Sequence, residues 1–184
     1  MRTVIVLAVA LGLGGPALAE DVLTSPYRQQ AAAGLRGLNQ SEISELEAGA
    51  GMGMARAAEL NGYPGPRHVL DAVAAGKLTV SAEQLRRIQQ VFDQMQQDAQ
   101  RLGASILEQE RQLEAGFSAA SITPDVLSSR VARIAALRGE LRTIHLSAHL
   151  ATRAVLSEAQ VVRYNELRGY TQGADEHQHP HHQH

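Results

Sequence analysis

The sequence predicts an all-α protein built on a long antiparallel helical hairpin with short flanking helices. Alanine, leucine, glutamine, arginine and glutamate dominate its 184 residues, and these residue types favour helices. Two long segments carry apolar residues in alternating steps of three and four, which is typical of helices that pack along one face. Only a few residues separate the two segments, so the chain is expected to turn back on itself.

The composition excludes several classes of protein. With no cysteine, the chain has no disulfide framework, thiolate metal cluster, cysteine nucleophile or lipid-modified N-terminal cysteine. Aromatic residues make up 3% of the chain, which argues against a base-stacking surface for nucleic acid. The balance of 17 basic and 19 acidic side chains argues against a phosphate-binding surface spread over the whole protein.

The first 19 residues are predicted to be a secretory signal. Arg2 supplies the positive start, residues 4–13 the apolar run, and Ala17-Leu18-Ala19 the small-residue cleavage site. The apolar run is too short to span a bilayer, and the alternative is a buried N-terminal helix. We therefore expect cleavage after Ala19, an exported protein, and no later segment that spans a membrane.

Residues 20–66 are predicted to form an N-terminal arm with short helices. One helix is expected to begin near Asn39 or Ser41, with Glu42 or Glu45 closing a capping box. Glycines at 49–53 interrupt the pattern, and Ala55 to Leu60 makes a further turn or two. Weak apolar content indicates that this arm docks on something larger.

Residues 67–170 are predicted to form the helical hairpin domain, after a short apolar segment from His68 to Ala75. The capping box Ser81-Ala82-Glu83-Gln84 begins the first long helix. This helix is expected to end near Gly116 and to be about 50 Å long. Its apolar stripe consists of Leu85, Ile88, Phe92, Met95, Ala99, Leu102, Ile106 and Leu113.

A second long helix is predicted from Thr123, its N-cap, and Pro124, its first helical residue, to about Val155. Apolar residues recur in it every seven positions, at Leu127, Ile134, Leu141, Ala148 and Val155. The first long helix has four arginines against six acidic residues, and the second five arginines against two, so their charges are complementary. Two helices cannot cover all of this apolar surface, which predicts a homodimer.

A second capping box, Ser157-Glu158-Ala159-Gln160, opens a final helix that is expected to reach Gly169. With the preceding residue it reads Leu156-Ser157-Glu158-Ala159-Gln160, which resembles the L-T/S-x-x-Q motif of the Spy/CpxP superfamily of periplasmic helical proteins. Val80-Ser81-Ala82-Glu83-Gln84 resembles a first copy, and the likeness covers roughly residues 55–170. The motif residues are Leu156, Ser157, Gln160, Ser81 and Gln84, for which helix capping is a sufficient role.

The resemblance implies a periplasmic protein with a curved hairpin that dimerises into a shallow cradle. It also implies one of two functions. The first is ATP-independent holding of unfolded envelope proteins in a stress response. The alternative is a heavy-metal sensor or metal-sequestering protein that signals to a membrane partner. A purely structural envelope protein is a third reading.

His145 and His149 are candidate metal ligands, because a spacing of four places both imidazoles on one face of a helix. Their nitrogens suit zinc, copper or nickel. Metal-sensing proteins of the family that the chain resembles carry a histidine and a methionine or histidine in this helix. His68 is a candidate third ligand. The alternatives are a partly buried His145 beside the apolar stripe and a surface His68.

Residues 171–184 are predicted to be a disordered tail with five histidines, at His177, His179, His181, His182 and His184. Such tracts bind late first-row metals, and the alternative is a solvated tail without function. Met52 and Met54 offer thioether ligands for copper, or pack the arm against the hairpin.

The sequence carries no catalytic motif, so the protein is expected not to be an enzyme. His145 to His149 lacks the glutamate of a zinc-protease helix, and neither a serine elbow nor a phosphate-binding loop is present. For client holding, the arginines of the second long helix, Arg130, Arg133 and Arg142, are the predicted contact residues, since charge speeds encounter and apolar surface retains the client.

Overall fold

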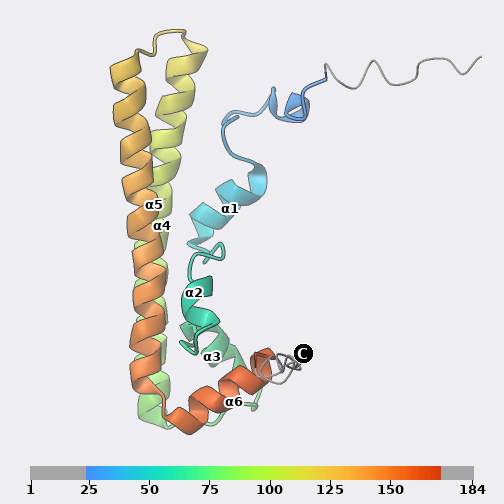
Figure 1. Cartoon of the computed structure of the whole chain (residues 1–184), viewed down its shortest axis with the longest axis vertical. Helices are drawn as coiled ribbons and strands as arrows, with labels where there is room; N and C mark the ends of the chain where they lie inside the picture. Colours follow the sequence, from blue (N-terminus) through green and yellow to red (C-terminus); the bar gives the residue numbers. More distant parts are fainter. Residues whose placement is uncertain (1–23, 171–184) are drawn as a thin grey trace, which may run out of the picture. The chain divides into compact units, whose positions relative to one another are not determined.

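The computed structural model describes residues 24–170, and every regular element in that range is helical (Figure 1). The chain divides into two compact units between Arg36 and Gly37, and the described part of the first contains one 3-10 helix, η1 (Arg28–Gln30). The second unit contains α1 (Gln40–Ala48), α2 (Arg56–Glu59), α3 (Pro66–Ala74), α4 (Ala82–Ser118), α5 (Pro124–Val155) and α6 (Glu158–Arg168). The all-α prediction is confirmed for these residues. The predicted signal segment and histidine tail lie outside them.

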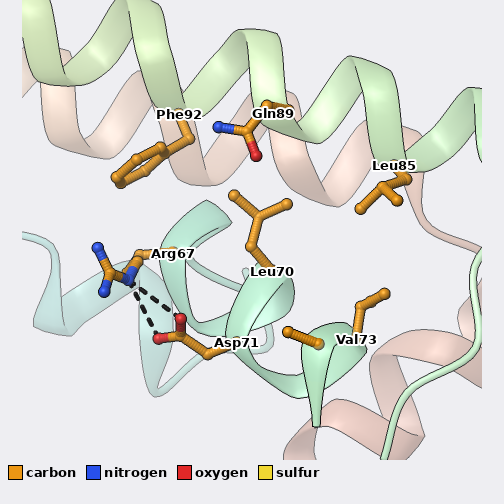
Figure 2. Close-up of a pocket in the computed structure, with 8 residues that line it drawn as sticks. Arg67, Leu70, Asp71, Val73, Leu85, Gln89 and Phe92 are labelled. Atoms are coloured by element: carbon orange, nitrogen blue, oxygen red, sulfur yellow. Dashed lines mark hydrogen bonds and ion pairs between the residues drawn. The ribbon is translucent and has the colours of Figure 1, made fainter. Parts of the chain in front are cut away.

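The two long helices, α4 and α5, pack together and lie side by side in Figure 1. The buried apolar residues of the pair include Ile88, Ala99, Leu102, Ile106, Leu107, Ile134, Leu137, Leu141 and Ala148. Leu85, expected in the same stripe, is instead 38% exposed. A hollow of about 360 Å³ between α4 and the short helix α3 is lined by Leu70, Val73, Leu85 and Phe92 (Figure 2). The helix α3 covers Leu85 only in part, so this side chain remains partly exposed.

Capping boxes begin three of the helices. Asn39 accepts a hydrogen bond from the Glu42 amide at 2.9 Å, and the Glu42 carboxylate accepts one from the Asn39 amide at 2.8 Å. The same reciprocal pair occurs at Ser81 with Gln84 and at Ser157 with Gln160. The boundary that the sequence left open between Asn39 and Ser41 is therefore Asn39, because its side chain satisfies the first free amides of α1.

The two motif glutamines join the starts of α4 and α6. The Gln84 Nε2 atom donates to Gln160 Oε1 at 2.9 Å and to the Val155 carbonyl at 2.9 Å. Gln160 Nε2 donates to Gln84 Oε1 at 3.1 Å and to the Thr79 carbonyl at 3.0 Å. Each glutamine thus caps its own helix and bonds to the other motif. The buried cluster beside them consists of Val69, Leu78, Ile88, Leu156, Val161 and Tyr164.

The segment from α1 to α3, residues 40–74, packs against the long helices. From here on, the arm means these residues and not the predicted range 20–66. Leu46 of α1 is 1% exposed. Its carbonyl oxygen lies so close to Gly103 of α4 that a Cβ atom on Gly103 would be 2.0 Å away. Only glycine permits this approach of the two backbones. Within residues 24–170, no helix is both long and apolar enough to cross a membrane.

Candidate functional site

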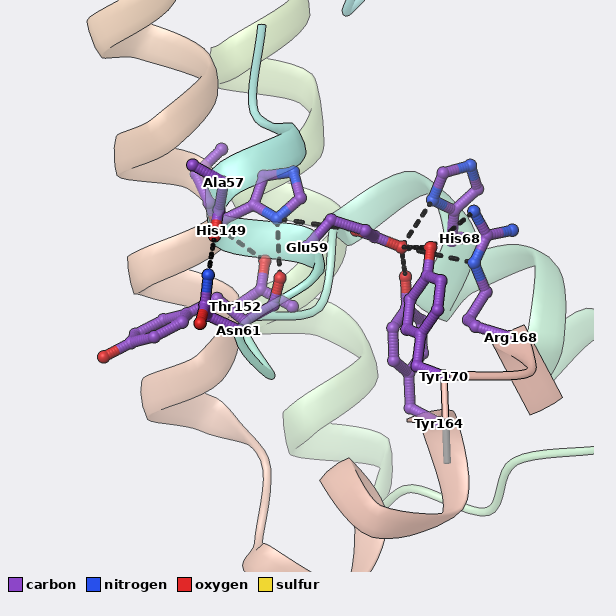
Figure 3. A network of polar contacts seen from close by, with 11 residues as sticks. Ala57, Glu59, Asn61, His68, His149, Thr152, Tyr164, Arg168 and Tyr170 are labelled. Atoms are coloured by element: carbon purple, nitrogen blue, oxygen red, sulfur yellow. Dashed lines mark hydrogen bonds and ion pairs between the residues drawn. The ribbon is translucent and has the colours of Figure 1, made fainter. Parts of the chain in front are cut away.

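A buried carboxylate, Glu59 at the end of α2, lies at the centre of a polar network (Figure 3). Glu59 is 8% exposed. Tyr164 and Tyr170 donate hydrogen bonds from their hydroxyls to Glu59 Oε1 at 2.5 Å and 3.1 Å. Arg168 donates from Nε to the same oxygen at 3.2 Å. This network ties the arm to α6 and to the residue that follows its C-terminal cap.

Two histidines approach the same carboxylate, one at each oxygen. His68 Nδ1 lies 3.6 Å from Glu59 Oε1, and His149 Nδ1 lies 3.7 Å from Glu59 Oε2. The stronger contact of His149 Nδ1 is with the Tyr63 carbonyl, at 2.7 Å. Because a carbonyl only accepts, the proton of His149 is on Nδ1, and in the neutral ring Nε2 carries the lone pair.

The network keeps Glu59 ionised. Burial opposes ionisation, but contact with His68 and the hydrogen bonds from Tyr164 and Tyr170 outweigh it, and they lower the Glu59 pKa to about 2. Burial, and then the hydrogen bond to Glu59, raise the pKa of Tyr164 above its usual range. At neutral pH the site is therefore a carboxylate held by phenol donors, which suits an anchor better than an acid–base catalyst.

His145 lies one turn before His149 on α5 and is 4% exposed. Burial and then the neighbouring His149 lower its pKa, while a backbone hydrogen bond with Ala50 opposes that shift. A bond that raises the pKa favours the protonated ring, so the ring donates and the Ala50 carbonyl accepts. In agreement, a Cβ atom on Gly51 would lie 4.0 Å from His145 Nδ1. The Nε2 atom of His145 is buried and has no hydrogen-bond partner in the described part of the chain.

The histidine pair therefore has its Nδ1 atoms occupied and leaves its Nε2 atoms for a ligand. Carbonyls of the arm hold both Nδ1–H groups, at Ala50 and at Tyr63. This arrangement fixes the tautomer that a metal ion needs, and metal-bound histidines commonly show it. A Cβ atom on Gly65 would lie 3.1 Å from His149 Nε2, so the absence of a side chain there leaves this nitrogen room.

The structure separates the three predicted metal ligands of the described range. His145 and His149 lie together under the arm, whereas His68 lies across Glu59 from His149. Among residues 24–170, no group of three or more histidine, aspartate or glutamate side chains is arranged to hold a metal ion. A metal ion on the pair would thus have two protein ligands here. The tail histidines 177–184 lie outside the described residues.

Two of the three predicted client-binding arginines share one groove. Arg130 and Arg133 line a hollow of about 560 Å³ together with Val126, which is 44% exposed. Arg130 also donates to Gln112 of α4. Arg142 does not line this groove, although it is exposed. The exposed apolar residues at this end of the long helices include Phe117 and Val131.

A larger hollow of about 860 Å³, called the α4–α5 groove below, runs between the two long helices. Val91, Met95, Ile144 and Ala151 contribute its apolar lining, while Arg87 and Asp98 lie on its α4 side. The lining residues of α5 alternate with His145 and Thr152, which are buried on another face of the helix. The groove and the histidine pair are therefore separate sites.

Sequence reasoning missed Glu59. It is one acidic residue in a short helical turn, and no periodicity or spacing marks it. Its partners, Tyr164, Arg168 and Tyr170, are more than one hundred positions away. Comparison with protein-family models, with curated proteins and with solved structures finds no match for this chain. The function must therefore be argued from the site itself and from the motif resemblance.

Proposed function

We propose that this chain is an exported metal-responsive binding protein of the periplasm, without enzymatic activity. His145 and His149 would bind zinc, copper or nickel through their Nε2 atoms. The observation that carries the proposal is the buried Nε2 of His145, which has no hydrogen-bond partner among residues 24–170. A second histidine, whose Nδ1–H is also held by the arm, lies one turn away. An imidazole nitrogen is the donor that these metals prefer, and an unpaired buried nitrogen is costly unless something binds it.

In this proposal, the arm transmits the metal-bound state of the histidine pair to a membrane partner. A metal ion on Nε2 draws electron density from the ring, so the Nδ1–H group becomes a stronger donor. Both of these donors bond to arm carbonyls, at Ala50 and Tyr63. Metal binding should therefore hold residues 50–63 more tightly against α5. This coupling is what a sensor requires, since the ligand must favour one of two arm states.

The test is calorimetric titration of the chain with zinc, copper and nickel, combined with thermal melting. We expect fixed stoichiometry at the helical pair and a rise in melting temperature from mass action. Truncation after Gly173 should lower metal capacity but keep the stabilisation, whereas His145→Ala with His149→Ala should do the reverse. His68→Ala is the matched control, because His68 is 45% exposed in its side chain and lies on the other side of Glu59. A truncated chain that neither binds nor is stabilised by any of the three metals would contradict the proposal.

A second candidate function is the holding of unfolded envelope proteins without ATP. The groove at Arg130 and Arg133 favours it, because the exposed Val126 lines the same groove as these cations. Replacing both arginines by glutamate should weaken the suppression of aggregation of a reduced model client, most strongly at low salt. Arg142→Glu, outside the groove, should have the smaller effect. Aggregation that the wild-type chain leaves unchanged would exclude this function.

We also propose that α4 and α5 form an antiparallel hairpin and that two copies of the chain make a curved homodimer. The bonds from Gln84 to Val155 and from Arg130 to Gln112 support the antiparallel order, since they pair early residues of one helix with late residues of the other. The open α4–α5 groove supports the dimer, because a monomer leaves this apolar lining in water.

A further inference from the structure

We infer that the α4–α5 groove is the surface on which a second copy of this chain docks, with the two α4 helices antiparallel and Arg87 of each copy facing Asp98 of the other. The inference rests on the proposed homodimer and names its surface and register. It is independent of the metal site, which lies on another face of α5.

The first support is the shape and chemistry of the groove. Its α4 side presents one helical face, with Arg87, Gln90, Val91, Gln94, Met95 and Asp98. On the α5 side the small residues Ser147, Ala148, Ala151 and Ala154 leave the hollow in which a helix can lie. The arm contacts these helices through His145 and His149, on a different face. Within the described chain, the groove has no occupant of its own.

The second support is charge complementarity of the groove with itself. Arg87 and Asp98 are eleven positions apart on α4, about 16 Å at 1.5 Å per residue. In a two-fold arrangement the same residues meet in reciprocal pairs. An antiparallel copy centred between the two charges places Arg87 opposite Asp98 at both ends. It also places Val91 opposite Gln94 and Gln90 opposite Met95, so apolar and amide side chains meet in the middle.

The two charges are available for this contact in different degrees. Arg87 is exposed and forms no ion pair within residues 24–170. Asp98 accepts hydrogen bonds from Gln94 at 2.9 Å and from Arg101 at 2.5 Å, and these bonds lower its pKa and keep it charged. An unfolded client carries no fixed pair of charges at this spacing. The groove therefore fits a second copy better than it fits a client.

The experiment uses two single variants, Arg87→Asp and Asp98→Arg, studied by sedimentation equilibrium alone and as a mixture. In either variant alone, like charges meet at both ends of the interface, so self-association should weaken roughly tenfold or more at low salt. In the mixture every end again joins opposite charges. The two variants should therefore form a heterodimer with an affinity near that of the wild type, and high salt should reduce the differences.

Arg86→Asp is the control, because Arg86 is the exposed neighbour of Arg87 and does not line the groove. It should leave association unchanged. The inference is overturned if the wild-type chain is a monomer at tens of micromolar, if Arg87→Asp dimerises as the wild type does, or if the mixture does not associate. Metal titration of the same variants keeps the proposals apart. Monomeric variants that still bind metal leave the metal-binding proposal standing, and dimeric protein that binds no metal overturns only that proposal.

Discussion

At the scale of single residues, Glu59 is a buried carboxylate that its hydrogen-bond partners keep ionised. Its pKa falls from 4.5 to about 2 although burial opposes the shift. A folded-state pKa below the unfolded value means that the carboxylate stabilises the fold above about pH 4.5. That stabilisation is lost progressively as the pH falls towards 2. At 1.36 kcal/mol per pKa unit it amounts to about 3 kcal/mol.

Glu59→Gln should therefore destabilise the protein by about 2–4 kcal/mol at pH 7, because the buried amide cannot replace the charged acceptor of Tyr164, Tyr170 and Arg168. Urea unfolding at pH 7 and at pH 3 measures the effect. The difference between the variant and the wild type should shrink at the lower pH. Glu47→Gln, at an exposed position of α1, is the control and should change little. A Glu59→Gln protein with wild-type stability at both pH values would contradict the anchoring role.

At the scale of elements, the docking of the arm depends on the contact between α1 and α4. Gly103 lies in the middle of a 37-residue helix, where glycine costs about 1 kcal/mol relative to alanine. The close approach of the Leu46 carbonyl explains why glycine is nevertheless needed. Helix propensity therefore predicts that Gly103→Ala stabilises the protein, whereas the packing against Leu46 predicts that it destabilises the protein.

Gly103→Ala should destabilise the protein and loosen α1, since the new Cβ atom would lie 2.0 Å from the Leu46 oxygen. Gly139→Ala is a matched substitution in α5, at a glycine with nothing within 4 Å of the added atom. It should instead stabilise the protein by up to about 1 kcal/mol. Thermal melting of both variants, with hydrogen exchange of residues 40–48, provides the measurement. Equal stabilisation by both substitutions would show that α1 does not approach α4 in this way.

At the scale of the whole molecule, two separate groups should shape the dependence of stability on pH. Burial and then His149 lower the pKa of His145 below its ordinary 6.5. The unfolded chain then binds this proton more readily than the folded chain does, so stability falls as the pH drops below 6.5. Protonation of Glu59 lowers the stability only below about pH 4.5, which is two pH units lower than the onset for His145.

The melting temperature without metal should accordingly decline in two stages between pH 8 and pH 3. His145→Gln should remove the upper stage and keep the lower one, while Glu59→Gln should do the opposite. Melting curves at half-unit steps of pH check this. The upper stage should become larger when metal is present, because protons displace the ion from Nε2 as the pH falls and its stabilisation is then lost. A single transition below pH 5 that is the same in the wild type and in His145→Gln would contradict the assignment.

The amino-acid sequence by itself determined the helices, because their signals are local. Alternating apolar steps, the boxes at Ser81 and Ser157, and Thr123 before Pro124 predicted the starts of α4, α5 and α6 where the structure has them. The spacing of His145 and His149 likewise predicted that both lie on one face of α5. Only the tertiary structure decided which face that is, which atoms of the two rings are occupied, and that Glu59 meets Tyr164, Arg168 and Tyr170. The physical reason is distance along the chain. Capping and helical periodicity act within about four residues, whereas the network joins side chains more than one hundred positions apart, and no local pattern encodes that pairing.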